Sequence, residues 1–443
     1  MKKICSISLA IAMVLSVLSG CSTGTSSASS GTAASSAASS AGSATAKQKV
    51  VNVWAWDVEY NIPVMKEAAR RYEAKHPDVK INVTEYAYDD ITQKINTILS
   101  SGVNDGLPEI MLSEDANVQK YITSYPGAFR DMTNDVDFSK FASYKVKVLT
   151  SKDHVYGVPF DIGTEGLFYR EDYLKKAGYT AADLTDITWD KYIEIGKKVK
   201  QATGKSMLTL DPSSMTIMRD FMQSSGTWYF TPDGKINIAN NPAINEGVRV
   251  YKELLSSGIV KLTSGWGEMA SALNKGDVAS IVTGCWIVPT ITAEKSQSGL
   301  WRVTRMPRLN ISGGTNYGNR GGSNWLVLKN APNSDVVADF LNEVFAKDVD
   351  FYDTILTKIG AIGAYQPANG SETYKKPVAF FGNEPIWSNF AEWAQKVPPI
   401  SVGVYSDEAD SFMATGVGDV VKNNTDIHKM LLSVEDQLKS QIQ

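Results

Sequence analysis

The amino-acid sequence predicts an α/β fold built on parallel strands. From Lys49 onward, short apolar runs typical of strands alternate with longer runs in which apolar residues recur every three or four positions. The links between these runs are short, which favours a parallel sheet covered by helices. With 443 residues and 43% hydrophobic content, the chain can bury a large core without a metal or a disulfide.

The first part of this body predicts strands at 49–57, 79–86 and 109–114, with a helix after each of the first two. The inward faces of these helices are formed by Ile62, Met65, Ala69 and Tyr72, and by Ile91, Ile95 and Leu99. Strand and helix therefore alternate from the beginning of the body.

The rest of the body is more helical. A helix is expected over 188–204, with Thr188 as its N-cap and Gly204 at its end. A hairpin with an Asp-Gly turn is expected over 229–238. Further helices are predicted over 245–258, over 334–348 and from Asp407 to the end, with strands at 276–284 and 321–330.

The beginning of the chain has the pattern of a bacterial lipoprotein signal. Residues 1–20 combine a basic start, a short apolar run and small residues, and the sequence LSGC that ends at Cys21 resembles the lipoprotein box. In that family the cysteine sulfur carries lipid, so we expect Cys21 to anchor the protein at the extracytoplasmic face of the cell membrane. Residues 21–48 are mostly Ser, Ala, Gly and Thr, which predicts a flexible tether.

Composition and motifs argue against several function classes. The net charge of −4 gives no electrostatic footprint for a nucleic acid. The body has no G-x-S-x-G motif, no P-loop and no H-E-x-x-H motif, and its histidines are far apart in sequence. We therefore expect neither a cofactor nor a metal site.

Aromatic residues stand beside polar ones near the ends of predicted strands and at turns. Such positions are Trp56 with Asp57, Asp115, Trp228 with Tyr229, Trp266, and Trp286. Ligands of parallel sheets bind beyond the carboxyl ends of the strands. An indole beside carboxylates suits a sugar, whose C–H groups stack on the ring while its hydroxyls donate to the acids. Trp189 and Trp301 are instead expected in the core.

Three stretches carry a family resemblance. They are VYGVPFDIGTEGLFYREDYLKKAG, ALNKGDVASIVTGCW and GGSNWLVLKNAPNSDVVADFLNEVF. In this order and spacing they resemble the extracellular solute-binding proteins of bacterial ABC importers, in the sugar-binding group that includes maltose-binding protein. The resemblance covers the chain from about Lys49.

This resemblance implies the two-lobed periplasmic-binding-protein fold of type II, also called the Venus-flytrap fold. Its α/β lobes are joined by crossovers, expected here at 164–170, at 321–328 and near residue 376. Lobe 1 is then expected at 49–164 and 326–375, and lobe 2 at 165–325 and 376–443. The ligand binds in the cleft, and the lobes close over it by hinge bending.

The resemblance also implies a set of ligand contacts. The matching positions are Trp56, Asp57, Asp115, Asp161, Trp228, Tyr229, Trp286, Arg320, Asn324 and Tyr405. Trp286 belongs to a G-x-W motif that stacks on the sugar in many members. Gly163 stands where the maltose-type sequence has a carboxylate, and Glu165 lies two residues on, which argues against maltose itself.

The resulting hypothesis is a monomeric, lipid-anchored receptor that captures a carbohydrate, most simply an oligosaccharide. It would deliver this ligand to ABC permease subunits in the membrane and would not be an enzyme. Two alternatives stay open. The same fold could bind a peptide, a polyamine or another small polar solute, or the chain could be a surface-anchored glycoside hydrolase that uses two of Asp57, Asp115 and Asp161.

Overall fold

A five-stranded mixed sheet lies at the centre of the first part of the protein. The computed structural model describes residues 48–102, 106–329 and 331–442. The strand order is β2 (Val79–Glu85), β1 (Lys49–Ala55), β3 (Ile110–Glu114), β12 (Ser323–Val327) and β6 (Val158–Pro159). β1 is parallel to β2 and β3, whereas β12 is antiparallel to β3 and β6. The predicted parallel pairing is therefore confirmed for β1, β2 and β3, whereas β12, which comes from a distant part of the chain, runs in the opposite direction.

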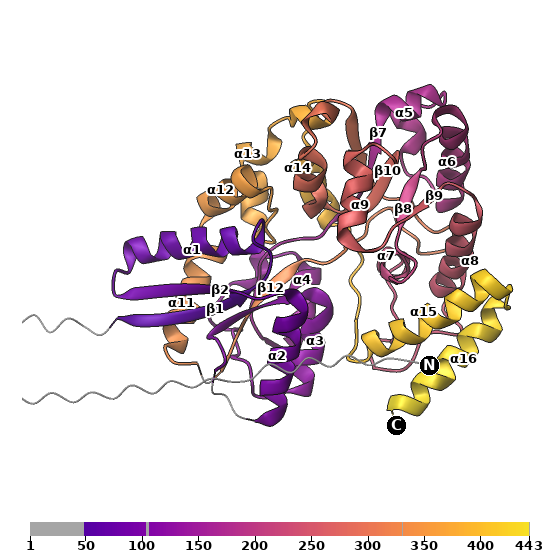
Figure 1. The fold of residues 1–443 in the computed structure, drawn as a ribbon. Helices are drawn as coiled ribbons and strands as arrows, with labels where there is room; N and C mark the ends of the chain where they lie inside the picture. Colours follow the sequence, from indigo (N-terminus) through magenta and orange to yellow (C-terminus); the bar gives the residue numbers. More distant parts are fainter. Residues whose placement is uncertain (1–47, 103–105, 330, 443) are drawn as a thin grey trace, which may run out of the picture. The chain divides into compact units, whose positions relative to one another are not determined.

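Side chains of this first sheet alternate between two cores, as the period of a strand requires. Val53 and Trp325 point into a central core, which is covered by α1 (Asn61–Lys75) and α11 (Ser334–Phe345). Trp54 and Leu326 point into an outer core, which is covered by α2 (Tyr88–Ser101) and α3 (Asp115–Ser124). Figure 1 shows α1 on one side of β1 and β2, and α2 and α3 on the other side.

A second, antiparallel sheet has the order β10 (Ser280–Gly284), β7 (Glu165–Arg170) and β11 (Trp301–Thr304). Phe168 and Ile281 point into the central core, whereas Leu167 and Val282 point into a C-terminal core. The central core therefore packs against both sheets, and each sheet has a further core of its own.

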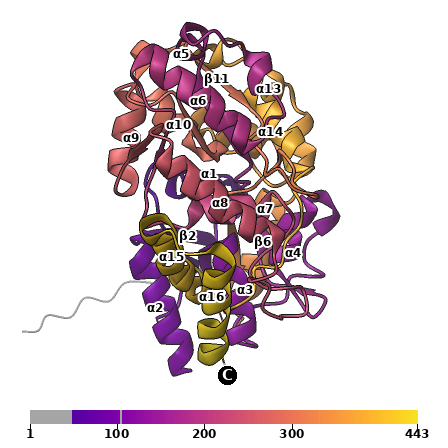
Figure 2. The same cartoon turned by 90° about the vertical axis from the view of Figure 1, so that its right-hand side faces the viewer.

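The remaining helices surround these cores. They are α4 (Ser143–Val148), α5 (Glu171–Lys176), α6 (Trp189–Thr203), α7 (Thr216–Gln223), α8 (Pro242–Ser256), α9 (Gly265–Asn274), α10 (Val288–Thr292), α12 (Val349–Ile359), α13 (Glu372–Lys375), α14 (Ile386–Ala394), α15 (Ser406–Asn423) and α16 (Ile427–Ile442). Short strands form two further pairs, β4 (Thr150–Ser151) with β5 (His154–Val155) and β8 (Leu208–Leu210) with β9 (Val260–Leu262). α15 and α16 both pack against α8, as Figure 2 shows.

The local signals in the sequence describe these elements well. The Thr188 hydroxyl caps α6 by accepting from the Lys191 N–H at 3.3 Å, and Gly204 ends the helix with a φ of 72°. Trp189 and Trp301 are fully buried, which confirms their predicted place in the core. The predicted signal, tether and lipidated Cys21 lie outside the described residues. In the part of the chain that is described, no helix combines the length and hydropathy needed to cross a bilayer.

Candidate functional site

Two chain segments cross side by side between the sheets. Residues 160–164 lead from β6 to β7, and residues 317–322 return to β12. The Arg320 N–H donates to the Gly163 carbonyl oxygen at 2.8 Å. The backbones approach so closely there that a Cβ on Gly163 would lie 2.2 Å from the Arg320 oxygen, so only glycine fits. These paired segments form two crossovers of a hinge.

The second crossover lies slightly earlier than expected, because residues 323–325 already pair in β12 within the first sheet. A later passage occurs between Val397, in the central core, and Val402, in the C-terminal core. Lys376, near the predicted third crossover, ends α13. The predicted lobe boundaries as a whole stay predictions.

A buried lysine–acid cluster, formed by Lys145, Asp115, Asn324 and Asp161, lies where the crossovers meet the first sheet. Lys145 is fully buried, and its Nζ donates to Asp115 and, at 3.2 Å, to the Ser323 carbonyl oxygen. Asn324 Nδ2 donates to the same carboxylate at 2.8 Å. Asp115 Oδ2 and Asn324 Oδ1 are buried without a hydrogen-bond partner among the described residues. Both oxygens therefore keep free lone pairs, but the surrounding side chains seal them from solvent in this conformation.

Asp161 ties the first crossover to β12 and to the start of α1 from within this cluster. Its carboxylate accepts from the Ser323 backbone N–H at 2.6 Å and from the Tyr60 hydroxyl at 3.1 Å. Burial raises the pKa of Asp161 to about 7, although the Lys145 ammonium acts in the opposite direction. Burial likewise raises the pKa of Asp115. The cluster is therefore sensitive to pH near neutrality.

A second buried ionic group surrounds the guanidinium of Arg320. Its Nε donates to Asp220 at 3.0 Å, its Nη2 donates to the other oxygen of the same carboxylate, and its Nη1 donates to the Thr283 hydroxyl at 3.3 Å. The fully buried Glu165 carboxylate lies 3.6 Å from Nε, and burial raises its pKa well above the ordinary value. Arg320 thus holds the second crossover against α7 and β10. Only part of its donor capacity stays free for a ligand.

Two tryptophans lie together beside the crossovers, and we call them the tryptophan pair. Trp286 donates its Nε1–H to the Arg320 carbonyl oxygen at 2.9 Å, and its ring covers Gly284, where a Cβ would lie 2.2 Å from Nε1. The Trp266 ring centroid is 5.7 Å from that of Trp286, at an interplanar angle of 38°. Trp286 is half-buried, whereas Trp266 is 52% exposed.

The first sheet contributes a second aromatic and acidic group. Trp56 packs edge-to-face on Tyr88 with centroids 5.1 Å apart. The Tyr88 hydroxyl donates to Glu114 at 3.1 Å and accepts from Asn117 Nδ2 at 2.8 Å. Burial raises the pKa of Glu114. Residues that follow β1 and β3 therefore meet at one edge of the sheet, as the parallel pairing of these strands requires.

Charged groups of α3, α7 and α15 meet near this edge. Lys120 Nζ on α3 lies 3.5 Å from an Asp407 carboxylate oxygen on α15. Arg219 on α7 lies 3.4 Å from Asp407 and forms a closer ion pair with Asp410. The Arg219 charge also acts on the pKa of Glu114, which it lowers against the larger effect of burial. Groups from the two sides of the hinge therefore interact across it.

The other predicted contacts lie in different settings. Trp228 is 5% exposed and donates to the Ser406 hydroxyl at 2.8 Å, and the fully buried Tyr229 donates to Asp410 at 2.6 Å. Both support α15 and present no free face in this conformation, so their predicted ligand contact gains no support. Tyr405, at the start of α15, is 39% exposed and can reach a ligand.

Asp57 is exposed and has a φ of 70°. Its Oδ1 accepts from the N–H groups of Glu59 and Tyr60 at 2.9 and 3.1 Å, which fixes the turn into α1. Among the described residues its other carboxylate oxygen has no hydrogen-bond partner. Asp57 therefore has a structural role in the turn, and its ligand contact stays a prediction.

Four residues of this region were absent from the predicted contacts, namely Glu114, Lys145, Arg219 and Trp266. Glu114 could have been found, because it directly precedes Asp115 at the end of β3. Trp266 stood out in the sequence only as one of several aromatics. Lys145 and Arg219 lie within helices and have no sequence pattern that distinguishes them from surface residues.

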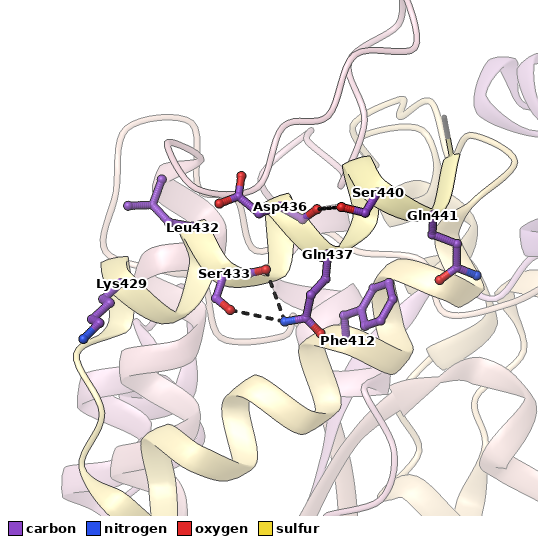
Figure 3. Close-up of a pocket in the computed structure, with 8 residues that line it drawn as sticks. All are labelled: Phe412, Lys429, Leu432, Ser433, Asp436, Gln437, Ser440 and Gln441. Atoms are coloured by element: carbon purple, nitrogen blue, oxygen red, sulfur yellow. Dashed lines mark hydrogen bonds between the residues drawn. The ribbon is translucent and has the colours of Figure 1, made fainter.

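Two other features lie apart from the crossovers. A shallow hollow of about 670 Å³ on α15 and α16 is lined by Phe412, Leu432, the charged Lys429 and Asp436, and polar residues of α16, as Figure 3 shows. Among the described residues, His76, Asp339 and Glu343 place ligand atoms within 4.8 Å of one another. Glu343 is already ion-paired with Lys75 at 2.6 Å, so these groups join α1 to α11.

Comparison with known proteins shows which proteins this chain resembles. A family model described as bacterial extracellular solute-binding protein matches residues 67–382. The lactose-binding protein of Rhizobium radiobacter is 44% identical to this chain, over 89% of the chain and 93% of the relative. An arabinooligosaccharide-binding protein of Bacillus subtilis is 24% identical, over 84% of the chain and 78% of the relative.

Solved structures show the same fold. The GacH receptor of Streptomyces glaucescens, described unliganded and in complex with acarbose, superimposes with a TM-score of 0.74 at 18% identity. The match covers 89% of this chain and 98% of that receptor. The predicted two-lobed fold is thereby confirmed.

Proposed function

Because the chain belongs to the family of bacterial extracellular solute-binding proteins, we propose that it captures lactose or a closely related disaccharide outside the cytoplasm and delivers it to the permease subunits of an ABC importer. The likeness to a lactose-binding protein over nearly the whole chain carries this proposal. The family consists of binding proteins, which confirms that the chain is not an enzyme.

The groups around the crossovers suit an uncharged polyol. Trp286 offers a half-buried ring for the apolar face of a sugar, and the half-buried Glu114 and the exposed Asp57 offer acceptors for its hydroxyls. These acceptors and rings come from both sides of the hinge, so closure would surround the ligand. A sugar that contacts both sides binds the closed form more tightly than the open form, and this difference drives closure.

Isothermal titration calorimetry of the purified full-length chain tests the ligand. Lactose is expected to bind saturably with micromolar affinity, about −8 kcal/mol, and to be recovered intact. Maltose, an arabinooligosaccharide, a dipeptide and spermidine are the comparison ligands. Saturable binding of one of these without binding of lactose would contradict the proposed ligand, and release of monosaccharides over hours would favour a hydrolase.

Lipid modification of Cys21 would place this monomeric receptor at the extracytoplasmic face of the membrane. The basic start, the apolar run and the LSGC sequence support it. Cys21→Ala is expected to move the protein from the detergent phase to the aqueous phase in detergent partitioning of expressing cells. Cys285→Ala is the matched control, because Cys285 is buried. An unchanged partition of Cys21→Ala would contradict the anchor.

A further inference from the structure

Trp266 is an exposed aromatic residue that does not stand alone. Single apolar side chains on a surface are ordinary and need no explanation. Trp266, however, is 52% exposed and lies beside the half-buried Trp286, with ring centroids 5.7 Å apart. The two indoles therefore form an apolar strip that begins at the crossover, where Trp286 Nε1 is fixed to the Arg320 carbonyl oxygen at 2.9 Å.

The turn that presents Trp266 is held by specific hydrogen bonds. The Gly265 N–H donates to Asp211 Oδ2 at 2.7 Å, and the Ser264 N–H donates to Glu268 Oε2 at 2.8 Å. Gly265 has a φ of 66°, which an L side chain rarely adopts, and this conformation opens α9 with Trp266 in its first turn. The backbone that carries the indole is thus fixed before any ligand binds, which lowers the entropy cost of stacking on it.

We propose that the tryptophan pair is a two-ring platform that makes the receptor selective for disaccharides over monosaccharides. Trp286 takes the sugar ring nearest the crossover, and Trp266 takes the adjoining ring. The inference rests on the proposed carbohydrate function and adds the residue that reads ligand length. The ring centroids are 5.7 Å apart, so each indole can face one of two adjoining sugar rings.

The test compares lactose with galactose in calorimetric titrations of the full-length chain. Trp266→Ala is expected to weaken lactose binding about tenfold, or about 1.4 kcal/mol, and to leave galactose binding within twofold of wild type. Trp286→Ala is expected to weaken both sugars, because every ligand contacts the inner ring. Trp266→Phe keeps a flat face and should retain most of the lactose affinity.

The control variant for Trp266→Ala changes another exposed apolar residue near α9. Leu262→Ala removes another exposed apolar side chain, 59% exposed at the end of β9, and should change neither affinity. Equal losses for lactose and galactose in Trp266→Ala, or no loss for either, would overturn the platform while the wild type still binds sugar. Absence of lactose and galactose binding by the wild type would instead overturn the proposed ligand, and the platform with it.

Discussion

Replacing Lys145 with methionine is expected to lower the free energy of unfolding by about 3–5 kcal/mol at pH 8. The fully buried ammonium donates to Asp115 and to the Ser323 carbonyl oxygen, and it also stabilises the charge of Asp161. Its removal leaves buried carboxylates without a cation. The loss should shrink at pH 5, where Asp161 takes up a proton instead. Urea denaturation at the two pH values measures both effects.

Two further variants control this experiment. Lys191→Met breaks an exposed ion pair with Glu194, whose atoms are 2.8 Å apart, and should leave stability almost unchanged, because solvent screens this pair. Lys145→Met combined with Asp115→Asn removes both charges of the buried pair and should be more stable than Lys145→Met alone. A loss below about 1 kcal/mol in Lys145→Met would show that the cluster does not stabilise the fold.

Asp161 is expected to make the protein less stable as the pH rises from about 4 to about 7. Its pKa is about 7 in the folded chain, whereas an unfolded chain has an ordinary aspartate pKa of about 3.9. Within this window the unfolded state loses the proton and the folded state keeps it, so stability falls by up to about 1.4 kcal/mol per pH unit, about 4 kcal/mol in all. Asp161→Asn keeps an acceptor for the Ser323 N–H and stays neutral.

The difference between Asp161→Asn and wild type should therefore be small near pH 4 and should favour the variant increasingly up to pH 8. Other buried carboxyls make the stability of both the variant and the wild type depend on pH. Only the difference in stability between the two proteins therefore reports on Asp161. Asp137→Asn is the control, because the Ser139 hydroxyl lowers the pKa of this exposed carboxyl. Its effect should have the opposite sign: Asp137→Asn should be less stable than wild type at neutral pH, and this difference should disappear as the pH falls below about 4. Parallel stability profiles for Asp161→Asn and wild type would contradict the prediction.

Local structure was largely predictable from sequence, because it depends on neighbouring residues. The helix over 334–348 was predicted from its apolar spacing, and Val337, Phe340 and Leu341 are indeed fully buried on α11. The direction of β12 was not predictable, because a strand's apolar pattern is the same whether it pairs parallel or antiparallel. Its partners β3 and β6 lie far away in the chain.

Residues of the candidate site were predictable only where the residue type and its neighbours in sequence indicate its position in the fold. Trp286 follows a strand end and a glycine, and it does lie at the crossover. Trp228 has equally polar neighbours in sequence, yet it is buried, because its Nε1 finds the Ser406 hydroxyl on α15. That contact joins residues 178 positions apart, and such a distance in sequence leaves no local signal.

The contact between Gly163 and Arg320 also has a mechanical consequence. Two unpaired segments could rotate independently of each other. Here the Arg320 N–H donates to the Gly163 carbonyl oxygen, and the Glu165 N–H donates to the Gly318 carbonyl oxygen at 2.9 Å. Any rotation of one sheet relative to the other must therefore bend both crossovers together. The Trp286 indole donates a hydrogen bond to the Arg320 carbonyl oxygen, so its position changes together with that of the second crossover when the hinge bends.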